Sequence, residues 1–270
     1  MRSESNPLLP AADLASFSPA FVLDVRDRIA YEEGHWPGAS HLDIKQWEKL
    51  ARTAEGALER INVWEAQIGG LGIDGRVPVI VYDDGRMTEA ARTWFILQWH
   101  GVDARVLDGG WTSLAVKPQF VSEQLSRRIA PVSFQRPASH VPAVGLINRE
   151  GLLESLGQGV QILDARTRGE HLGEDLRSNE RGGHLPGAKW LAHAELLNPD
   201  GTLKSAHELR ARMSAAGLED GAPVVTHCDA GGRAALAALA AVVAGQRNVH
   251  AYYLSFSDWA ADGSCPIAKP

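Results

Sequence analysis

The sequence has few cysteines, and this scarcity limits the kinds of protein that the chain can be. Cys228 and Cys265 are the only two among 270 residues, which excludes a secreted scaffold held together by disulfides. Two cysteines without a cluster of histidines nearby also make no zinc motif, and we expect neither a metal nor another cofactor. Because free cysteines are typical of a reducing compartment, we expect a cytoplasmic protein.

Long apolar runs and an excess of positive charge are missing as well. The longest apolar run, residues 234–244, has 11 residues, far short of the ~20 that span a bilayer. Residues 1–10 show no apolar run of a signal peptide, so we expect no membrane partner. The net charge of −6 argues against nucleic acid as a partner, because phosphate binding requires clustered Lys and Arg.

Three sequence blocks recur in the same order in the two halves of the chain. The matching pairs are residues 21–26 (FVLDVR) with 161–166 (QILDAR), 34–39 (GHWPGA) with 183–188 (GHLPGA), and 77–84 (VPVIVYDD) with 222–229 (APVVTHCD). Between the first and second blocks the second half carries an insertion, residues 173–183. This pattern predicts a duplicated domain in which Asp83 takes the position of Cys228.

Each copy alternates short strand signals with helical patterns. The strands are rich in β-branched residues, as buried parallel strands are. The expected strands are residues 21–25, 77–82, 104–107, 160–164, 223–227 and 249–254, and the expected helices are 44–58, 88–100, 207–216 and 234–244. Such alternation predicts an α/β fold, with a mainly parallel sheet flanked by helices in each copy. We expect domains at residues 8–115 and 145–264, joined by a proline-containing linker at 116–144.

The third block of the second copy runs into the sequence Cys-Asp-Ala-Gly-Gly-Arg, residues 228–233. Cys228 follows a buried strand, at the edge of the sheet where α/β proteins bind ligands. The glycines let the loop curl with its N–H groups inward, and the following helix adds partial positive charge at its N-terminus. Such a nest favours the nucleophilic thiolate and stabilises the anion formed after reaction. A buried structural cysteine is the alternative. The expected anion-binding residues are Asp229, Ala230, Gly231, Gly232 and Arg233.

These motifs resemble the rhodanese family, and in particular its tandem-domain members. The resemblance rests on the Cys-x-x-Gly-x-Arg loop that opens a helix, the LDVR…GHWPGA and LDAR…GHLPGA blocks, and VLDGGW at residues 106–111. It implies two tandem rhodanese-like domains and a sulfurtransferase. Cys228 would attack a small sulfur donor, become a persulfide and pass the sulfur to an acceptor such as cyanide, a thiol or a protein. The resemblance also implies that the first domain, with Asp83 in place of the cysteine, is catalytically silent.

The loop departs from the two best-known branches of this family. Mercaptopyruvate sulfurtransferases resemble Cys-Gly-Ser-Gly-Val and thiosulfate sulfurtransferases resemble Cys-Arg-Lys-Gly-Val, whereas residues 228–232 here are Cys-Asp-Ala-Gly-Gly. Thiosulfate and 3-mercaptopyruvate therefore both stay open as donors, beside a non-enzymatic module that delivers persulfide to a partner. Related phosphatases and arsenate reductases resemble Cys-x5-Arg. The shorter Cys-x4-Arg loop here suits a single sulfur atom.

Charges around the expected site have mixed signs. Asp229 lies beside the nucleophile, and Glu170 stands four residues after Arg166, where both branches of the family place an arginine that helps to bind the donor. Both carboxylates weaken the attraction for an anionic donor. Arg233 either offsets them or pairs structurally with Asp229 or Asp164.

The remaining polar candidates have a functional and a structural reading. Arg177 and Arg181 lie where mercaptopyruvate-type enzymes also carry arginines, and they either bind the donor or are solvated surface charges. His227, at the end of a buried strand, is expected to alternate away from Cys228, and Cys265 is expected to be an exposed thiol. For the motif pairs we favour structural roles; these are Asp24 with Arg26, Asp164 with Arg166, and the two GHxPGA histidines His35 and His184.

Overall fold

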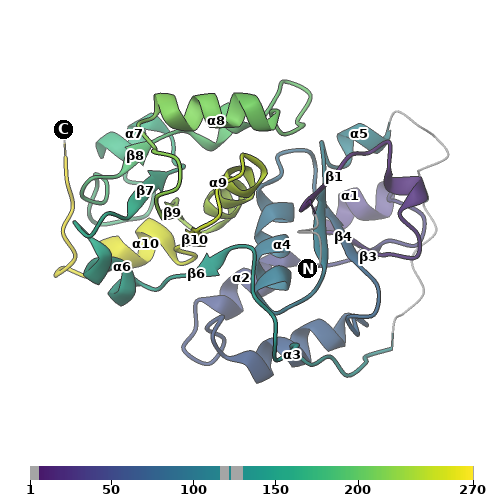
Figure 1. The fold of residues 1–270 in the computed structure, drawn as a ribbon. Helices are drawn as coiled ribbons and strands as arrows, with labels where there is room; N and C mark the ends of the chain where they lie inside the picture. The colour runs from purple at the N-terminus through teal and green to yellow at the C-terminus, as the bar shows by residue number, and fades with distance from the viewer. Residues whose placement is uncertain (1–5, 116–121, 123–129, 270) are drawn as a thin grey trace. The chain divides into compact units, whose positions relative to one another are not determined.

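The computed structural model describes residues 6–115, 122 and 130–269. The chain divides into two compact units between Pro142 and Ala143, except that the short segment Pro199–Thr202 is grouped with the first unit. Each unit has a five-stranded sheet, in the order β1-β5-β4-β2-β3 in the first and β6-β10-β9-β7-β8 in the second (Figure 1). All neighbouring strands pair in parallel. The second order repeats the first with each strand number raised by five, which confirms the predicted duplicated α/β fold.

The first unit alternates strands and helices along the chain. Its elements are β1 (Leu8–Leu9), η1 (Leu14–Ser16), β2 (Phe21–Asp24), α1 (Arg28–Glu33), β3 (Ser40–His41), α2 (Ile44–Ala51), α3 (Ile61–Gly70), β4 (Val79–Tyr82), α4 (Thr88–Trp99), β5 (Ala104–Leu107) and α5 (Thr112–Ala115). All four residues of β4 are buried, as expected for the central strand of a parallel sheet. Ile80 packs with Leu9, Leu107 and Leu114, while α4 packs against β4 and β5.

The second unit repeats this arrangement. Its elements are β6 (Gly145–Leu146), α6 (Arg149–Ser155), β7 (Gln161–Asp164), α7 (Arg168–Leu172), β8 (Lys189–Trp190), η3 (His193–Leu196), α8 (Ala206–Ala215), β9 (Val224–His227), α9 (Gly232–Val243), β10 (Val249–Ala251) and α10 (Ser255–Ala261). Along β9 the side chains alternate between the two faces of the sheet. Val225 packs with Phe256 and Trp259 of α10, whereas the Thr226 hydroxyl donates to the Ala234 carbonyl oxygen of α9 at 2.9 Å.

Two helix boundaries differ from the sequence-based expectation by two residues or more. The helix expected over residues 44–58 ends at Ala51, because the Thr53 hydroxyl donates to the Leu50 carbonyl oxygen and accepts from the Gly56 N–H, which turns the chain. Helix α9 begins at Gly232, two residues earlier than expected. Gly232 and Arg233 therefore lie in its first turn, and the loop after β9 is only four residues long, 228–231.

The prediction that Cys265 is an exposed thiol is wrong. Its side chain is 2% exposed and packs with Trp259 in the core of the second unit. The chain after α10 folds back over this core, because the Trp259 indole N–H donates to the Pro266 carbonyl oxygen at 2.8 Å and Ala268 pairs with His184. The second unit therefore extends past residue 264, where we expected it to end.

The expected linker, residues 116–144, lies partly outside the described residues. Its described part from residue 130 to 142 belongs to the first unit. The Val132 N–H donates to the Gly69 carbonyl oxygen at 2.9 Å, and the Arg136 N–H donates to the Glu65 carboxylate at 2.8 Å. Phe134 is buried, so this stretch is packed along α3.

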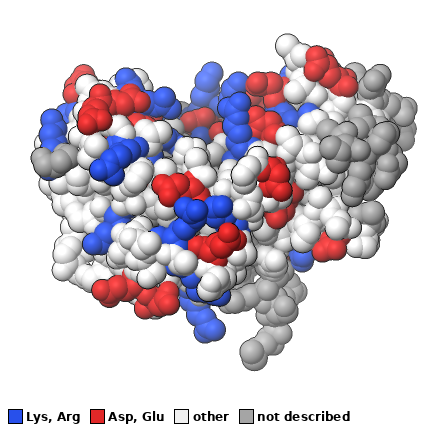
Figure 2. All heavy atoms as spheres, turned by 90° about the horizontal axis from the view of Figure 1, so that it is seen from above, with Lys and Arg blue, Asp and Glu red and all other residues white. Residues whose placement is uncertain are grey.

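Within the described residues, no helix is both long and apolar enough to cross a membrane. On the face drawn in Figure 2, basic and acidic side chains are interspersed. This mixture agrees with the small net charge of −6.

Candidate active site

Cys228 follows β9 directly, and its sulfur faces the turn that leads into α9. The side chain is 1% exposed, and the Gly231 N–H donates to its sulfur at 3.0 Å. Gly231 has a φ of +99° and caps the helix. A Cβ at this position would lie 2.6 Å from the Tyr253 carbonyl oxygen, so only glycine fits this tight turn. The sequence thus places the cysteine in a short nest at the N-terminus of a 12-residue helix.

Ser255 completes this nest, although no sequence motif predicted a site residue at this position. Its hydroxyl oxygen accepts from the Cys228 N–H at 3.1 Å and lies 3.7 Å from the Cys228 sulfur, while its proton goes to the Tyr252 carbonyl oxygen at 2.8 Å. The serine is fully buried and has a φ of +62°. Because a non-glycine residue with positive φ is costly, such a position indicates a local constraint. In the sequence, Ser255 opens the stretch SFSDW, residues 255–259, which forms the start of α10.

Arg233 pairs with Glu170, which is neither of the partners considered from the sequence. Two guanidinium nitrogens donate to the two carboxylate oxygens at 2.6 and 2.8 Å, a bidentate geometry that only arginine supplies. Glu170 is 1% exposed. Burial would raise the pKa of Glu170, but hydrogen bonds from Arg233 and Thr167 lower it to about 2. The same pairing outweighs burial and raises the pKa of Arg233.

Glu170 is also fixed by its own helix. It is the third residue of α7, and its carboxylate accepts from the Thr167 N–H and hydroxyl at 3.0 and 2.8 Å. The Thr167 hydroxyl in turn accepts from the Glu170 N–H, which completes a capping box. The carboxylate is thereby held between the start of α7 and the first turn of α9.

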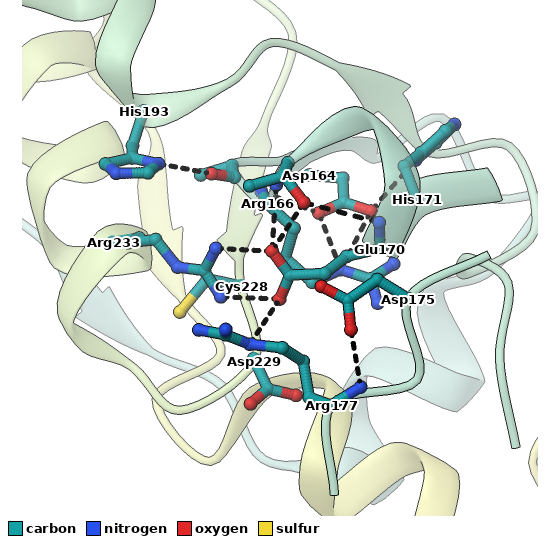
Figure 3. Close-up of polar contacts among 12 residues, drawn as sticks. Asp164, Arg166, Glu170, His171, Asp175, Arg177, His193, Cys228, Asp229 and Arg233 are labelled. Atoms are coloured by element: carbon teal, nitrogen blue, oxygen red, sulfur yellow. Dashed lines mark hydrogen bonds and ion pairs between the residues drawn. The ribbon is translucent and has the colours of Figure 1, made fainter. Parts of the chain in front are cut away.

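The insertion loop brings Arg177 and Asn179 to the same place. Arg177 has a φ of +53°, its Nε lies 3.6 Å from a Glu170 carboxylate oxygen, and its side chain is 54% exposed. The Asn179 amide donates to the Asp229 carboxylate at 2.8 Å. Figure 3 shows Arg233 and Arg177 both directed at the Glu170 carboxylate, with Cys228 beside Arg233. Residues far apart in the sequence thus converge on the nest.

Arg181, the other candidate of the insertion, lies elsewhere. Its guanidinium donates to the carbonyl oxygens of Trp259, Ala260 and Cys265 at 2.9–3.0 Å, and to that of Asp262. These acceptors lie at the end of α10 and just beyond it. The structure therefore assigns Arg181 to the carboxyl end of this helix and does not bring it to the Cys228 loop.

The Asp-x-Arg pairs have the structural role that we favoured. The Arg166 guanidinium donates to the Asp164 carboxylate at 2.7–3.2 Å and to the Gly183 carbonyl oxygen at 2.8 Å. Arg26 makes the same contacts with Asp24 and Gly34 in the first unit. Each pair ties the end of a strand to the GHxPGA turn.

The motif histidines have packing contacts in both copies. The rings of His35 and His184 stack at 4.0 Å on Tyr31 and His171, respectively. His227 contacts the Cys228 carbonyl oxygen at 3.2 Å and lies 3.7 Å from the Asp164 carboxylate. Burial lowers the pKa of His227 to about 4, so this histidine is neutral at pH 7.

In the first copy, the Asp83 carboxyl group occupies the equivalent nest, where burial raises its pKa and the hydrogen bonds from backbone N–H groups oppose that rise. One carboxylate oxygen accepts from the N–H groups of Gly85 and Met87 at 2.9 and 3.0 Å. The other accepts from those of Glu89 and Ala90 at 3.1 and 3.2 Å. The side chain is 2% exposed. Here the group that the nest binds is a side chain of the protein itself.

The duplicated α/β fold agrees with the comparisons with known proteins. The family model of the rhodanese-like domain matches residues 11–117 and 149–262. The chain belongs to the rhodanese family. Its relatives include the 3-mercaptopyruvate sulfurtransferase of Escherichia coli K12, 28% identical over 88% of this chain and 84% of that protein. They also include the thiosulfate sulfurtransferase of Mus musculus, 29% identical over 94% of this chain and 85% of that protein.

A solved structure supports the same rhodanese assignment. The crystal structure of SseA from Escherichia coli, described as a 3-mercaptopyruvate sulfotransferase, superposes with a TM-score of 0.79 at 26% identity. The match covers 94% of this chain and 100% of SseA. The likeness therefore extends over both rhodanese-like domains.

Proposed function

We propose that this rhodanese is a sulfurtransferase that carries sulfane sulfur on Cys228. The observation that supports this most directly is the position of the Cys228 sulfur, which lies in a helix-capping nest and accepts the Gly231 N–H at 3.0 Å. A nest of N–H groups stabilises a negative sulfur, first as the attacking thiolate and then as the persulfide. The relatives named as sulfurtransferases agree with this chemistry.

The reaction proceeds in two half-reactions that share one intermediate. The Cys228 thiolate attacks the outer sulfur of thiosulfate; the new S–S bond forms as the old one breaks, and sulfite leaves with the electron pair. The Cys228 persulfide then loses its outer sulfur to a nucleophilic acceptor, cyanide or a thiol, and the thiolate returns. No net oxidant or reductant is consumed in the cyanide reaction, which yields thiocyanate. In this proposal a thiol of another protein is a further acceptor. We also propose that the sulfurtransferase is located in the cytoplasm, where both of its free cysteines stay reduced.

The side chain that we assign to the donor is Arg177. It is the more exposed of the two guanidinium groups on Glu170, and the insertion loop that carries it is tied to Asp229 by Asn179. Arg233 and the loop residues 229–232 support the charge on sulfur from the other side. Arg181 has no part in this assignment, because its guanidinium binds carbonyl oxygens after α10.

The test is the mass of the intact protein after incubation with thiosulfate and removal of the donor. The wild type and Cys265→Ser should each gain one sulfur atom, and added cyanide should remove it as thiocyanate. Cys228→Ser should gain none. Cys265→Ser is the matched control, because Cys265 is equally buried but lies outside the nest. Sulfur on Cys265 would refute the assignment, and a wild type that takes sulfur from no donor would favour a non-enzymatic module.

A further inference from the structure

Four charged side chains surround the Cys228 loop, and their formal charges cancel. Arg233 and Arg177 are positive, and Glu170 and Asp229 are negative. His193 contacts the Ala165 carbonyl oxygen at 3.3 Å (Figure 3). Burial and the Arg233 charge lower the pKa of His193, so it adds no positive charge at pH 7. Because Glu170 and Asp229 offset both guanidinium charges, Arg177 offers a donor its hydrogen bonds but no uncompensated positive charge. The partial charges of the backbone N–H groups supply the remaining attraction.

Glu170 is the residue that cancels the most useful charge. Its carboxylate accepts hydrogen bonds from both Nη atoms of Arg233, and one carboxylate oxygen lies 3.6 Å from the Nε of Arg177. A guanidinium that is neutralised by a buried carboxylate attracts a second anion far less than a free one does. Without this carboxylate the same two arginines would present two positive charges to the donor.

We propose that Glu170 is a specificity-determining residue, which makes the site favour sulfur donors with one negative charge over dianionic thiosulfate. This inference rests on the proposed sulfurtransferase function. The attacking thiolate already carries one negative charge, so thiosulfate brings the reacting group to three negative charges and a monoanionic donor brings it to two. The third charge has no uncompensated cation to bind, whereas two negative charges meet the Gly231 N–H and the α9 N-terminus.

A matched pair of donors isolates this effect. Thiosulfate and methanethiosulfonate both carry an outer sulfur on a sulfonyl group, and they differ by one negative charge. In each case the Cys228 thiolate forms an S–S bond to the outer sulfur while the bond from that sulfur to the sulfonyl sulfur breaks. The leaving groups are sulfite and methanesulfinate, and each takes the electron pair. The step is otherwise the same, so the ratio of the two kcat/KM values reports the charge preference of the site.

The experiment compares this ratio in the wild type and in Glu170→Gln, with cyanide as acceptor. Glutamine keeps the shape and one acceptor oxygen for Arg233 but removes the negative charge. We expect the thiosulfate/methanethiosulfonate ratio to rise about tenfold, which corresponds to ~1.4 kcal/mol for one added charge near the site. The rise should come from the KM for thiosulfate and should shrink in high salt, because ions screen exposed charges.

Two further variants make the result decisive. Glu180→Gln removes the same charge from an exposed position of the insertion loop and should leave the ratio unchanged. Asp229→Asn removes the other carboxylate of the group and should raise the ratio in the same direction, even if Glu170→Gln fails to fold. Loss of rate with both donors alike is the signature of structural damage.

The possible failures are distinct. If the wild type transfers sulfur from both donors but neither Glu170→Gln nor Asp229→Asn raises the ratio, Glu170 does not set the charge preference and the inference is wrong. A rise of equal size in Glu180→Gln would also overturn it, since net charge alone would then explain the change. If neither donor adds sulfur to Cys228 in the wild type, the proposed function itself fails, and the inference fails with it.

Discussion

Replacing Arg233 with methionine should destabilise the second rhodanese domain in a manner that depends on pH. The guanidinium makes two short hydrogen bonds to Glu170, at 2.6 and 2.8 Å. Methionine keeps the length of the side chain and a high helix propensity in the first turn of α9. The change therefore leaves the buried Glu170 carboxylate without its principal cation and alters little else.

The magnitude follows from the pKa of Glu170, which lies at about 2 instead of the ordinary 4.5. A carboxyl group with a lowered pKa stabilises the fold above its unfolded pKa, and this contribution disappears as the pH falls from 4.5 toward 2. The difference corresponds to an upper limit of about 3 kcal/mol. Thr167 and Arg177 supply a share of it, so we assign ~2 kcal/mol to Arg233, in the range of hydrogen bonds to charged groups.

The assay is urea unfolding of both proteins at pH 7 and at pH 3, followed by tryptophan fluorescence and fitted with two transitions, because the chain has two domains. Arg233→Met should lower the free energy of unfolding of one transition by ~2 kcal/mol at pH 7 and by well under half of that at pH 3, where the stranded carboxylate is protonated. Arg212→Met is the matched control, since its partner Glu195 is exposed and such pairs contribute about 0.5 kcal/mol or less. An equal loss for Arg233→Met at both pH values would refute the reasoning.

Three other predictions concern the first domain. Asp83→Ala removes four buried N–H···O bonds and should lower the free energy of unfolding by ~2–4 kcal/mol in urea titration, while Asp83→Cys in a Cys228→Ser background should give no thiocyanate from thiosulfate and cyanide. A rate near that of the wild type would contradict the second expectation. The two ring nitrogens of His100 have no hydrogen-bond partner within the described part of the chain, and burial lowers the pKa of this histidine to about 3. The folded state therefore favours the neutral ring. As the pH falls below 6.5, the free energy of unfolding should decrease by ~1.4 kcal/mol per pH unit. His100→Leu should then raise the melting temperature more at pH 5 than at pH 8, and an equal shift at both would count against this origin.

The sequence was sufficient for the parts of the fold that repeat. Asp24 and Asp164 each end the apolar run of the first repeated block, and the other two blocks follow in the same order in both halves. This regularity predicted two parallel sheets without any knowledge of contacts. Cys228 was recognisable because a glycine-rich turn between strand and helix depends on local backbone chemistry. Local patterns of this kind are legible in a single sequence, since the residues that create them are neighbours.

The parts that failed depend on contacts between residues distant in the sequence. Arg233 and Glu170 are 63 residues apart, and the sequence suggested Asp229 or Asp164 as a partner because both stand next to recognised motifs. Cys265 was expected to be exposed because its Gly-Ser-Cys-Pro context is typical of a loop. The return of that loop over Trp259 requires the tertiary structure. In both cases the neighbouring residues in the sequence did not reveal the contact, because Glu170 and Trp259 come from other parts of the chain.

The contacts of Asp83 in its nest are a guide to what the Cys228 nest can hold. Each carboxylate oxygen of Asp83 is two bonds from Cβ, which is also the place of the outer sulfur in a cysteine persulfide. One of these oxygens accepts from the second and third residues of α4, Glu89 and Ala90. The corresponding residues of α9 are Arg233 and Ala234, so we expect their N–H groups to bind the outer sulfur of a Cys228 persulfide. The first domain thus holds a carboxyl group of its own chain at the place where, in the proposed reaction, the second domain holds the outer sulfur of a persulfide during turnover.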